Sequence, residues 1–245
     1  MLARSLIAGL MLAAVSVPAV AERPALTILF HVRPPYSDRA PGLGVDGLLA
    51  APVQEALAKA GLRADWVEMP PARQTEEIKR NSEATCGLGW FKRPEREAFA
   101  SFTHPIYHDH PAIVVARKDD PRFADGMSLR DSFRDASRLL VVKTGYSYGA
   151  TIDAWIKQLQ PAAESSSGDN ERLLGMIAQK RGDYIIMAPE EADDLLGSMT
   201  PLAEALRPVR LSDAPDGELR YLMCSKATPP ELIDRINQTL APLVR

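Results

Sequence analysis

Arginine and aromatic side chains recur where short apolar segments of this chain end. Arg33 and Tyr36 follow one such segment, and Trp90, Phe91 and Arg96 follow another. A planar guanidinium presents paired N–H donors that match a carboxylate, and flat aromatic rings form apolar walls for a ring or an alkyl chain. These residue types suit the binding of a small carboxylated solute.

A turn made of Gly145, Tyr146 and Ser147 is a second candidate for anion binding. It lies between a predicted strand and a predicted helix, and backbone N–H groups at the start of a helix attract anions. A plain strand-to-helix turn would use the same residues, so both interpretations stay open.

Basic residues near the predicted strand ends would make a cleft more basic than the protein as a whole. They are Arg33, Arg73, Arg96 and Lys143, in a chain with 29 Lys and Arg, 32 Asp and Glu, and a net charge of −3. A basic cleft favours an anion without a free α-amino group, although exposed arginines on loops are common. The mildly acidic total gives no reason to expect nucleic acid as a partner.

Histidines form the only other cluster of side chains that are able to bind a metal or take part in chemistry. His104, His108 and His110 lie near Tyr107, with Asp109 between the last two. Two histidines at i and i+2 would bind a metal if the segment were a strand, but a solvated loop fits as well. We predict no metal, no cofactor and no catalytic residue.

Strands and helices alternate in the first half of the chain. Apolar patterns predict strands at 26–32, 64–68 and 85–90, separated by helices at 49–60 and 73–80. This order is typical of a parallel sheet with crossover helices.

A second alternating unit follows the acidic segment at 119–121. Strands are expected at 139–143 and 184–187, with helices around 152–159 and 173–177. A strand at 219–224 and a helix that begins near residue 228 complete the chain. Each unit is predicted to be an open, mostly parallel sheet, and ligands of such sheets bind beyond the carboxyl ends of the strands.

The first 21 residues have the pattern of a cleaved signal peptide. Arg4 is followed by an apolar stretch too short to span a membrane, and Ala19 and Ala21 form a small-residue cleavage motif. We expect cleavage after Ala21 and a periplasmic protein. The residue directly after the predicted cut is Glu22 and not a cysteine, so no lipid anchor on the new amino terminus is expected.

The chain has two cysteines, Cys86 and Cys224, and both lie in apolar segments that resemble strands. They are either buried free thiols or a disulfide, which an oxidising compartment would permit.

The segment around Arg96 resembles a known family. Glu95 and Arg96 are followed by an aromatic residue, a small hydroxyl residue, a proline and a tyrosine, as in the family 3 extracellular solute-binding proteins. The residues that match are Phe102, Thr103, Pro105 and Tyr107, with weaker matches at Pro35, Tyr36, Gly145, Gly182, Asp183 and Tyr184. The resemblance extends over essentially the whole chain after residue 21.

The resemblance implies a two-lobed α/β fold of the type II periplasmic-binding-protein class, with two crossover strands as hinges. Residues 22–116 with 219–245 would form the first lobe, and 117–218 the second. Proteins of this kind close on a solute and pass it to a membrane permease of an ABC importer. We therefore expect a monomer whose partners are a small-molecule ligand and such a permease.

The resemblance also implies roles for individual residues. Arg96 aligns with the arginine that binds the ligand carboxylate, whereas the alternative is a surface arginine paired with a neighbouring glutamate. Phe30 and Ala188 take the places of the aspartates that hold a ligand ammonium, and Arg33 replaces an aromatic residue. Glu190 would substitute for the missing aspartates, or it serves only the dipole of its helix.

Two other functions stay open beside the transport receptor, which is not an enzyme. A periplasmic cyclohexadienyl dehydratase resembles these receptors, and in such an enzyme Glu190 or His31 would serve as a general acid. A binding protein that signals to a membrane sensor is the third alternative.

Overall fold

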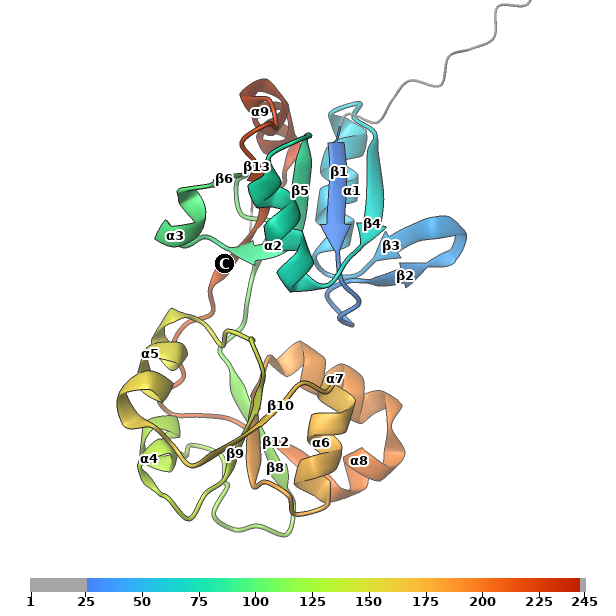
Figure 1. Ribbon diagram of the computed structural model, residues 1–245. Coiled ribbons are helices and arrows are strands. Elements are labelled where there is room, and N and C mark those ends of the chain that lie inside the picture. Colours follow the sequence, from blue (N-terminus) through green and yellow to red (C-terminus); the bar gives the residue numbers. More distant parts are fainter. Residues whose placement is uncertain (1–25, 243–245) are drawn as a thin grey trace, which may run out of the picture.

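The chain folds into two lobes, each built on its own sheet and joined by two chain segments (Figure 1). This computed structural model describes residues 26–242. The predicted signal peptide and its cleavage site lie outside the described residues. Among the described residues, no helix has the length and apolar character needed to cross a bilayer.

The first lobe contains a sheet with the strand order β4-β1-β5-β13-β6, and β7 pairs with the other end of β13. β1 pairs in parallel with β4 and β5, whereas β13 is antiparallel to β5, β6 and β7. The strands are β1 (Leu26–Phe30), β4 (Ala64–Glu68), β5 (Thr85–Phe91), β6 (Ala100–Phe102), β7 (Tyr107–His108) and β13 (Leu219–Ser225). A hairpin of β2 (Asp38–Ala40) and β3 (Gly44–Asp46) extends from this lobe.

The second lobe has the strand order β10-β9-β11-β8-β12. β9 pairs in parallel with β10 and β11, and β8 is antiparallel to β11 and β12. The strands are β8 (Ile113–Arg117), β9 (Leu140–Lys143), β10 (Ala163–Ser166), β11 (Tyr184–Met187) and β12 (Leu206–Val209). Both sheets are thus mixed, with a parallel part as predicted and antiparallel strands where the chain crosses between lobes.

Helices pack around both sheets (Figure 1). In the first lobe they are α1 (Ala50–Lys59), α2 (Pro71–Arg80), α3 (Pro94–Glu97) and α9 (Pro230–Thr239), with a short 3-10 turn at Pro41–Leu43. In the second lobe they are α4 (Leu129–Arg134), α5 (Ala150–Leu159), α6 (Asn170–Ala178), α7 (Pro189–Ser198) and α8 (Thr200–Ala205). α9, which the sequence predicted to begin near residue 228, begins at Pro230 with Pro229 as its cap, and the buried hydroxyl of Thr228 lies 3.2 Å from that of Ser225.

The sequence-based boundary between residues 116 and 117 falls inside β8. All residues of this strand pair with β11 or β12, and Val114, Val115 and Ala116 are fully buried. The hydrogen bonds therefore place β8 with the second lobe. β13, where the chain returns from the second lobe, pairs with β5 and β6 of the first sheet.

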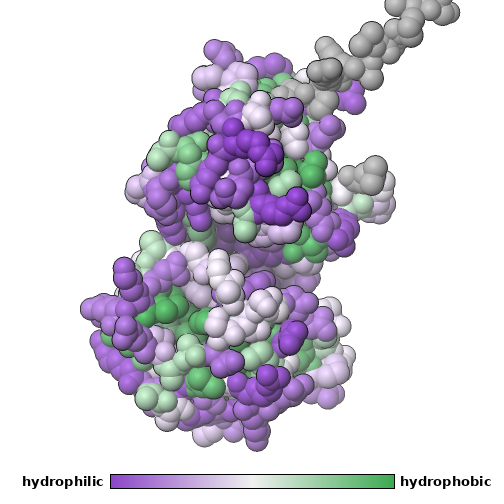
Figure 2. Space-filling model, viewed as in Figure 1, coloured by the Kyte–Doolittle hydropathy of each residue, from purple (hydrophilic) through white to green (hydrophobic). Residues whose placement is uncertain are grey.

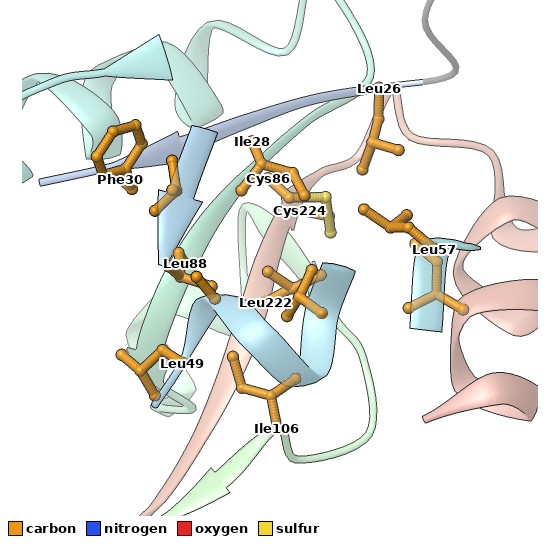
Figure 3. Close-up of a cluster of buried hydrophobic side chains, with 14 of the residues drawn as sticks. Leu26, Ile28, Phe30, Leu49, Leu57, Cys86, Leu88, Ile106, Leu222 and Cys224 are labelled. Carbon is orange, nitrogen blue, oxygen red and sulfur yellow. A yellow bond between two sulfur atoms is a disulfide. The ribbon is translucent and has the colours of Figure 1, made fainter. Parts of the chain in front are cut away.

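A disulfide joins the two central strands of the first lobe. Cys86 and Cys224 lie opposite each other in the β5–β13 pair and form the bond (Figure 3). Leucine and isoleucine side chains such as Ile28 and Leu222 surround it, and both cysteines are fully buried. Of the two alternatives for these cysteines, the structure has the disulfide.

The two crossover segments pass very close to each other between the lobes. The backbone N–H of Asp109 donates to the carbonyl of Glu218 at 3.0 Å. A Cβ atom on Gly217 would lie 1.6 Å from the carbonyl oxygen of Asp109, so only glycine permits this approach.

In the second lobe, a largely buried network of ion pairs links the end of β8 to the start of β11. Arg117 donates to Asp120 at 3.1 Å and to Asp183 at 3.0 Å, and Arg122 donates to the same two carboxylates at 2.6 and 2.8 Å. Hydrogen bonding from Arg122 holds the pKa of Asp120 below its usual value. Burial alone would raise the pKa of Asp183, but bonds from Leu139 N–H and the two arginines outweigh it and lower this pKa.

This network predicts a loss of stability in acid. A carboxylate whose folded pKa lies below its unfolded value, about 3.9, stabilises the fold above that pH and ceases to do so as the pH falls through the folded pKa. The difference in unfolding free energy between the natural protein and Asp183→Asn should therefore shrink below about pH 4. Urea unfolding at several pH values measures it, with Asp131→Asn, in an exposed ion pair, as the control. A difference that is constant down to pH 3 would contradict the prediction.

Candidate functional site

A cavity lies between the two lobes, where the molecule narrows to a waist (Figure 2). Arg33 and Phe91 line it from the first lobe, and Lys143, Tyr146 and Glu191 line it from the second. These residues follow or end strands β1, β5, β9 and β11, so the cavity lies beyond the carboxyl ends of the parallel strands.

Arg33 makes a two-bond ion pair between the lobes. Its Nε and Nη2 donate to the two carboxylate oxygens of Glu191, each at 2.8 Å. The Asn170 side-chain amide donates to the same carboxylate at 3.0 Å. The guanidinium also lies over the rings of Tyr36 and Tyr146, at 4.5 and 5.3 Å from their centroids. Both side chains of the ion pair are buried, because Arg33 is 10% exposed and Glu191 3%.

Glu190 makes a second contact between the lobes. The hydroxyls of Tyr36 and Tyr107 donate to its two oxygens at 2.9 and 2.8 Å, and His110 Nδ1 lies against the same carboxylate. Burial alone would raise the pKa of Glu190, but these hydrogen bonds hold it below its usual value. The carboxylate is therefore ionised at neutral pH, and both of its oxygens already accept a hydrogen bond from a tyrosine.

Two further ion pairs lie where the chain crosses between the lobes. Arg220 donates to Asp109 at 2.6 Å and to the carbonyl of Gly89 at 3.0 Å, and its guanidinium lies 4.4 Å from the centroid of the Phe91 ring. Arg93 makes two bonds to Glu218, at 2.5 and 3.0 Å. Glu218 also accepts the backbone N–H of Ala150, the first residue of α5.

Lys143 is the cavity cation that makes no ion pair among the described residues. Its Nζ donates to Asn170 at 3.3 Å and lies 5.8 Å from the centroid of the Tyr146 ring. Burial lowers the pKa of Lys143, and the charge of Glu191 opposes this shift. An anion in the cavity would remove part of the cost of burying this ammonium group.

The cleft is less basic than the sequence predicted, because its charges are balanced. Glu191 and Asp109 neutralise Arg33 and Arg220, and Arg73 lies exposed on α2, away from the cavity. The guanidinium of Arg96 donates to the Phe91 carbonyl at 2.8 Å and lies over the Trp90 ring, outside the cavity. The sequence predicted a cleft more basic than the protein as a whole, but it did not predict that Arg33 and Arg220 are paired with carboxylates.

The structure brings together only part of the predicted site. Arg33, Phe91, Tyr146 and Ser147 line the cavity, and Tyr36 lies beneath Arg33. Glu190 binds tyrosines instead of facing the cavity, and Gly145 forms the turn with a φ of 72°. Trp90 packs against Ile78 and donates to Gln74 at 3.0 Å, and Ser147 donates to Asp153 at 2.5 Å.

The two residues named as general acids are poorly suited to that role. Glu190 is ionised at neutral pH for the reason given above. Burial, with the nearby charges of Arg33, Lys143 and Arg220, lowers the pKa of His31 to about 4, so His31 is neutral at pH 7. No group of three metal-ligating side chains occurs within residues 26–242.

Glu191, Asn170 and Arg220 were not predicted as site residues, and Asp109 was named only beside the histidines. For Glu191 there was a signal, since it is the second of two acidic residues in the first turn of a predicted helix. The others had none, because Arg220 and Asp109 are 111 positions apart and meet only when the two crossover segments lie side by side.

No known family profile matches the sequence, and no curated protein sequence matches it significantly. Solved structures do match. An ancestral arginine-binding protein bound to arginine has a TM-score of 0.67 at 15% identity, over 89% of this chain and 91% of that one. The arginine-binding protein of T. maritima has a TM-score of 0.64 at 16% identity, over 88% of each chain.

GshT, described with glutathione import and the cystine ABC importer TcyBC of Streptococcus mutans, also matches. Its TM-score is 0.67 at 15% identity, over 88% of this chain and 87% of that one. At such identities the likeness is one of fold, and it covers both lobes. The chain therefore has the two-lobed α/β fold of periplasmic solute-binding proteins, which confirms the fold that its sequence predicted.

Proposed function

We propose that this protein is a periplasmic receptor that captures a small carboxylated solute between its lobes and presents it to the permease of an ABC importer. On this proposal the chain is exported, cut after Ala21, and acts as a monomer that binds but does not transform its ligand. It would then be a divergent member of the family 3 extracellular solute-binding proteins.

The observation that carries the proposal is a cavity shared by both lobes that contains a lysine, Lys143, with no ion-pair partner within residues 26–242. Lys143 ends β9, and the turn to α5 follows it, with Tyr146 and Ser147 on the cavity wall. Phe91 adds an apolar wall from the first lobe. Two of the structural neighbours are named for arginine binding and one for glutathione import, and both of these solutes carry carboxylates.

Thermal melting of residues 22–245 against organic acids, aromatic acids and amino acids tests the proposal. A solute that binds only the folded protein raises its melting temperature, because it adds about 2.7 kcal/mol at a hundredfold excess over its dissociation constant. With the responding acid in hand, Lys143→Gln should weaken binding roughly 10- to 100-fold, the usual value of a hydrogen bond to a charged group. Isothermal titration calorimetry measures that change.

Lys157→Gln is the matched control, since Lys157 is exposed on α5 and does not line the cavity. It should bind the acid as the natural protein does. Equal affinity in Lys143→Gln would exclude Lys143 from the site, and preference for cations without a carboxylate would overturn the proposed solute class.

A further inference from the structure

The guanidinium of Arg33 lies in a set of groups that mostly belong to the other lobe. Glu191 comes from α7, Asn170 from α6, and Tyr146 from the turn after β9. These three elements of the second lobe converge on one side chain of the first lobe. Two hydrogen bonds of equal length to one carboxylate are the geometry in which a guanidinium and a carboxylate recognise each other best.

The second lobe builds this arrangement from its own residues. Glu191 lies in the first turn of the ten-residue helix α7, where the helix dipole favours a negative charge. The side-chain amide of Asn170 donates to Glu191 at 3.0 Å, which orients the carboxylate. At 3% exposure this carboxylate would be costly to bury without a cation beside it.

The first lobe holds Arg33 firmly in a tight turn. Arg33 N–H donates to the carbonyl of Ser37 at 2.7 Å, and Tyr36 N–H donates to the carbonyl of Arg33 at 2.8 Å. The Tyr36 ring then supports the guanidinium from its own lobe. Because the turn fixes the backbone of Arg33, separation of the two lobes would break both of its bonds to Glu191.

We propose that Glu191, Asn170 and Tyr146 form a guanidinium-binding site on the second lobe, and that Arg33 fills it as a built-in ligand that holds the lobes together without solute. The remaining guanidinium nitrogen, Nη1, has no protein acceptor among the described residues, and Arg33 lines the cavity. The proposal that Arg33 fills this site rests on the proposed function in one respect. A solute that enters the cavity finds the guanidinium-binding site occupied, and it is therefore bound through its anionic part.

Chemical rescue tests the built-in ligand. In Arg33→Ala the site is empty, so the free protein should have a larger radius of gyration in small-angle X-ray scattering and a lower melting temperature. Methylguanidinium chloride, at concentrations too low to denature, should restore both. Once the site is saturated, the melting temperature should rise by about 3 to 5 °C for each further tenfold increase of the probe.

Two controls make the rescue specific. Methylammonium chloride has the same charge without the paired donors, and it should have a much smaller effect. Arg39→Ala removes an arginine that also makes two bonds to one carboxylate, at 2.7 and 2.8 Å to Glu68, but this pair is exposed and lies within the first lobe. Neither Arg39→Ala nor the natural protein should respond selectively to methylguanidinium.

Arg33→Lys keeps the charge but not the paired donors, so it is expected to fold and to show the same increase in radius. An unchanged radius in Arg33→Lys, or an equal response to the two salts in Arg33→Ala, would overturn the inference. The rescue is measured without solute, so its failure leaves the melting screen with organic acids as a separate test of the proposed function.

Discussion

Replacement of Cys86 and Cys224 together by alanine is expected to lower the melting temperature by about 10 to 20 °C. The disulfide joins residues separated by 138 positions in the sequence, and the loop that it closes contains the whole second lobe. For a loop of this length the chain-entropy account assigns about 5 kcal/mol to the bond. Alanine is preferred to serine because both positions are fully buried, and an unpaired hydroxyl there would add a further cost.

Circular dichroism melting with and without a reducing agent measures the effect. The natural protein should melt lower when the disulfide is reduced, and the double alanine variant should be insensitive to the reducing agent. If reduction leaves the melting temperature of the natural protein unchanged, the disulfide contributes little to stability and this prediction is wrong.

Arg117→Met is expected to cost about 3 to 5 kcal/mol of unfolding free energy, as is usual when one partner of a buried ion pair is removed. Arg117 is 8% exposed and donates to two carboxylates and to the carbonyls of Ile177 and Gly182. Methionine would fill much of the space but satisfy none of these acceptors. Arg122 would still neutralise part of the charge, which favours the lower end of the range.

Arg134→Met provides the comparison. Arg134 donates to Asp131 at 2.8 Å, but the two side chains are 52% and 74% exposed, and exposed pairs contribute less than about 1 kcal/mol. Urea unfolding of the three proteins gives both values. Equal losses in the two variants would show that burial does not decide the contribution of these ion pairs.

Local signals in the sequence were sufficient for most central elements of the fold. The strands at 64–68 and 184–187 have the predicted bounds, and a proline follows the end of each by two residues. The short strands β6, β7, β10 and β12 were not predicted, because two to four residues carry too little pattern. These strands form only because the neighbouring strand supplies their hydrogen bonds.

Part of the predicted set of site residues comes together in the structure. Arg33, Phe91 and Tyr146 follow or end strands and line one cavity, and their role in binding a solute stays a prediction. Their electrostatic roles were not predictable. A count of arginines indicated a basic cleft, but it did not include the carboxylates that approach from the other lobe.

The two α/β units, the ends of their strands and the types of side chain available at the cleft depend on neighbours a few positions away, so the sequence was sufficient to predict them. Which charges are free depends instead on contacts between distant segments. Arg33 and Glu191 are 158 positions apart and meet only when the two lobes meet, whereas Arg220 and Asp109 are 111 apart and meet only where β13 pairs with β7. The same folding leaves Lys143 without an acidic partner in the described residues, and this geometry is what makes it the candidate anchor for a solute.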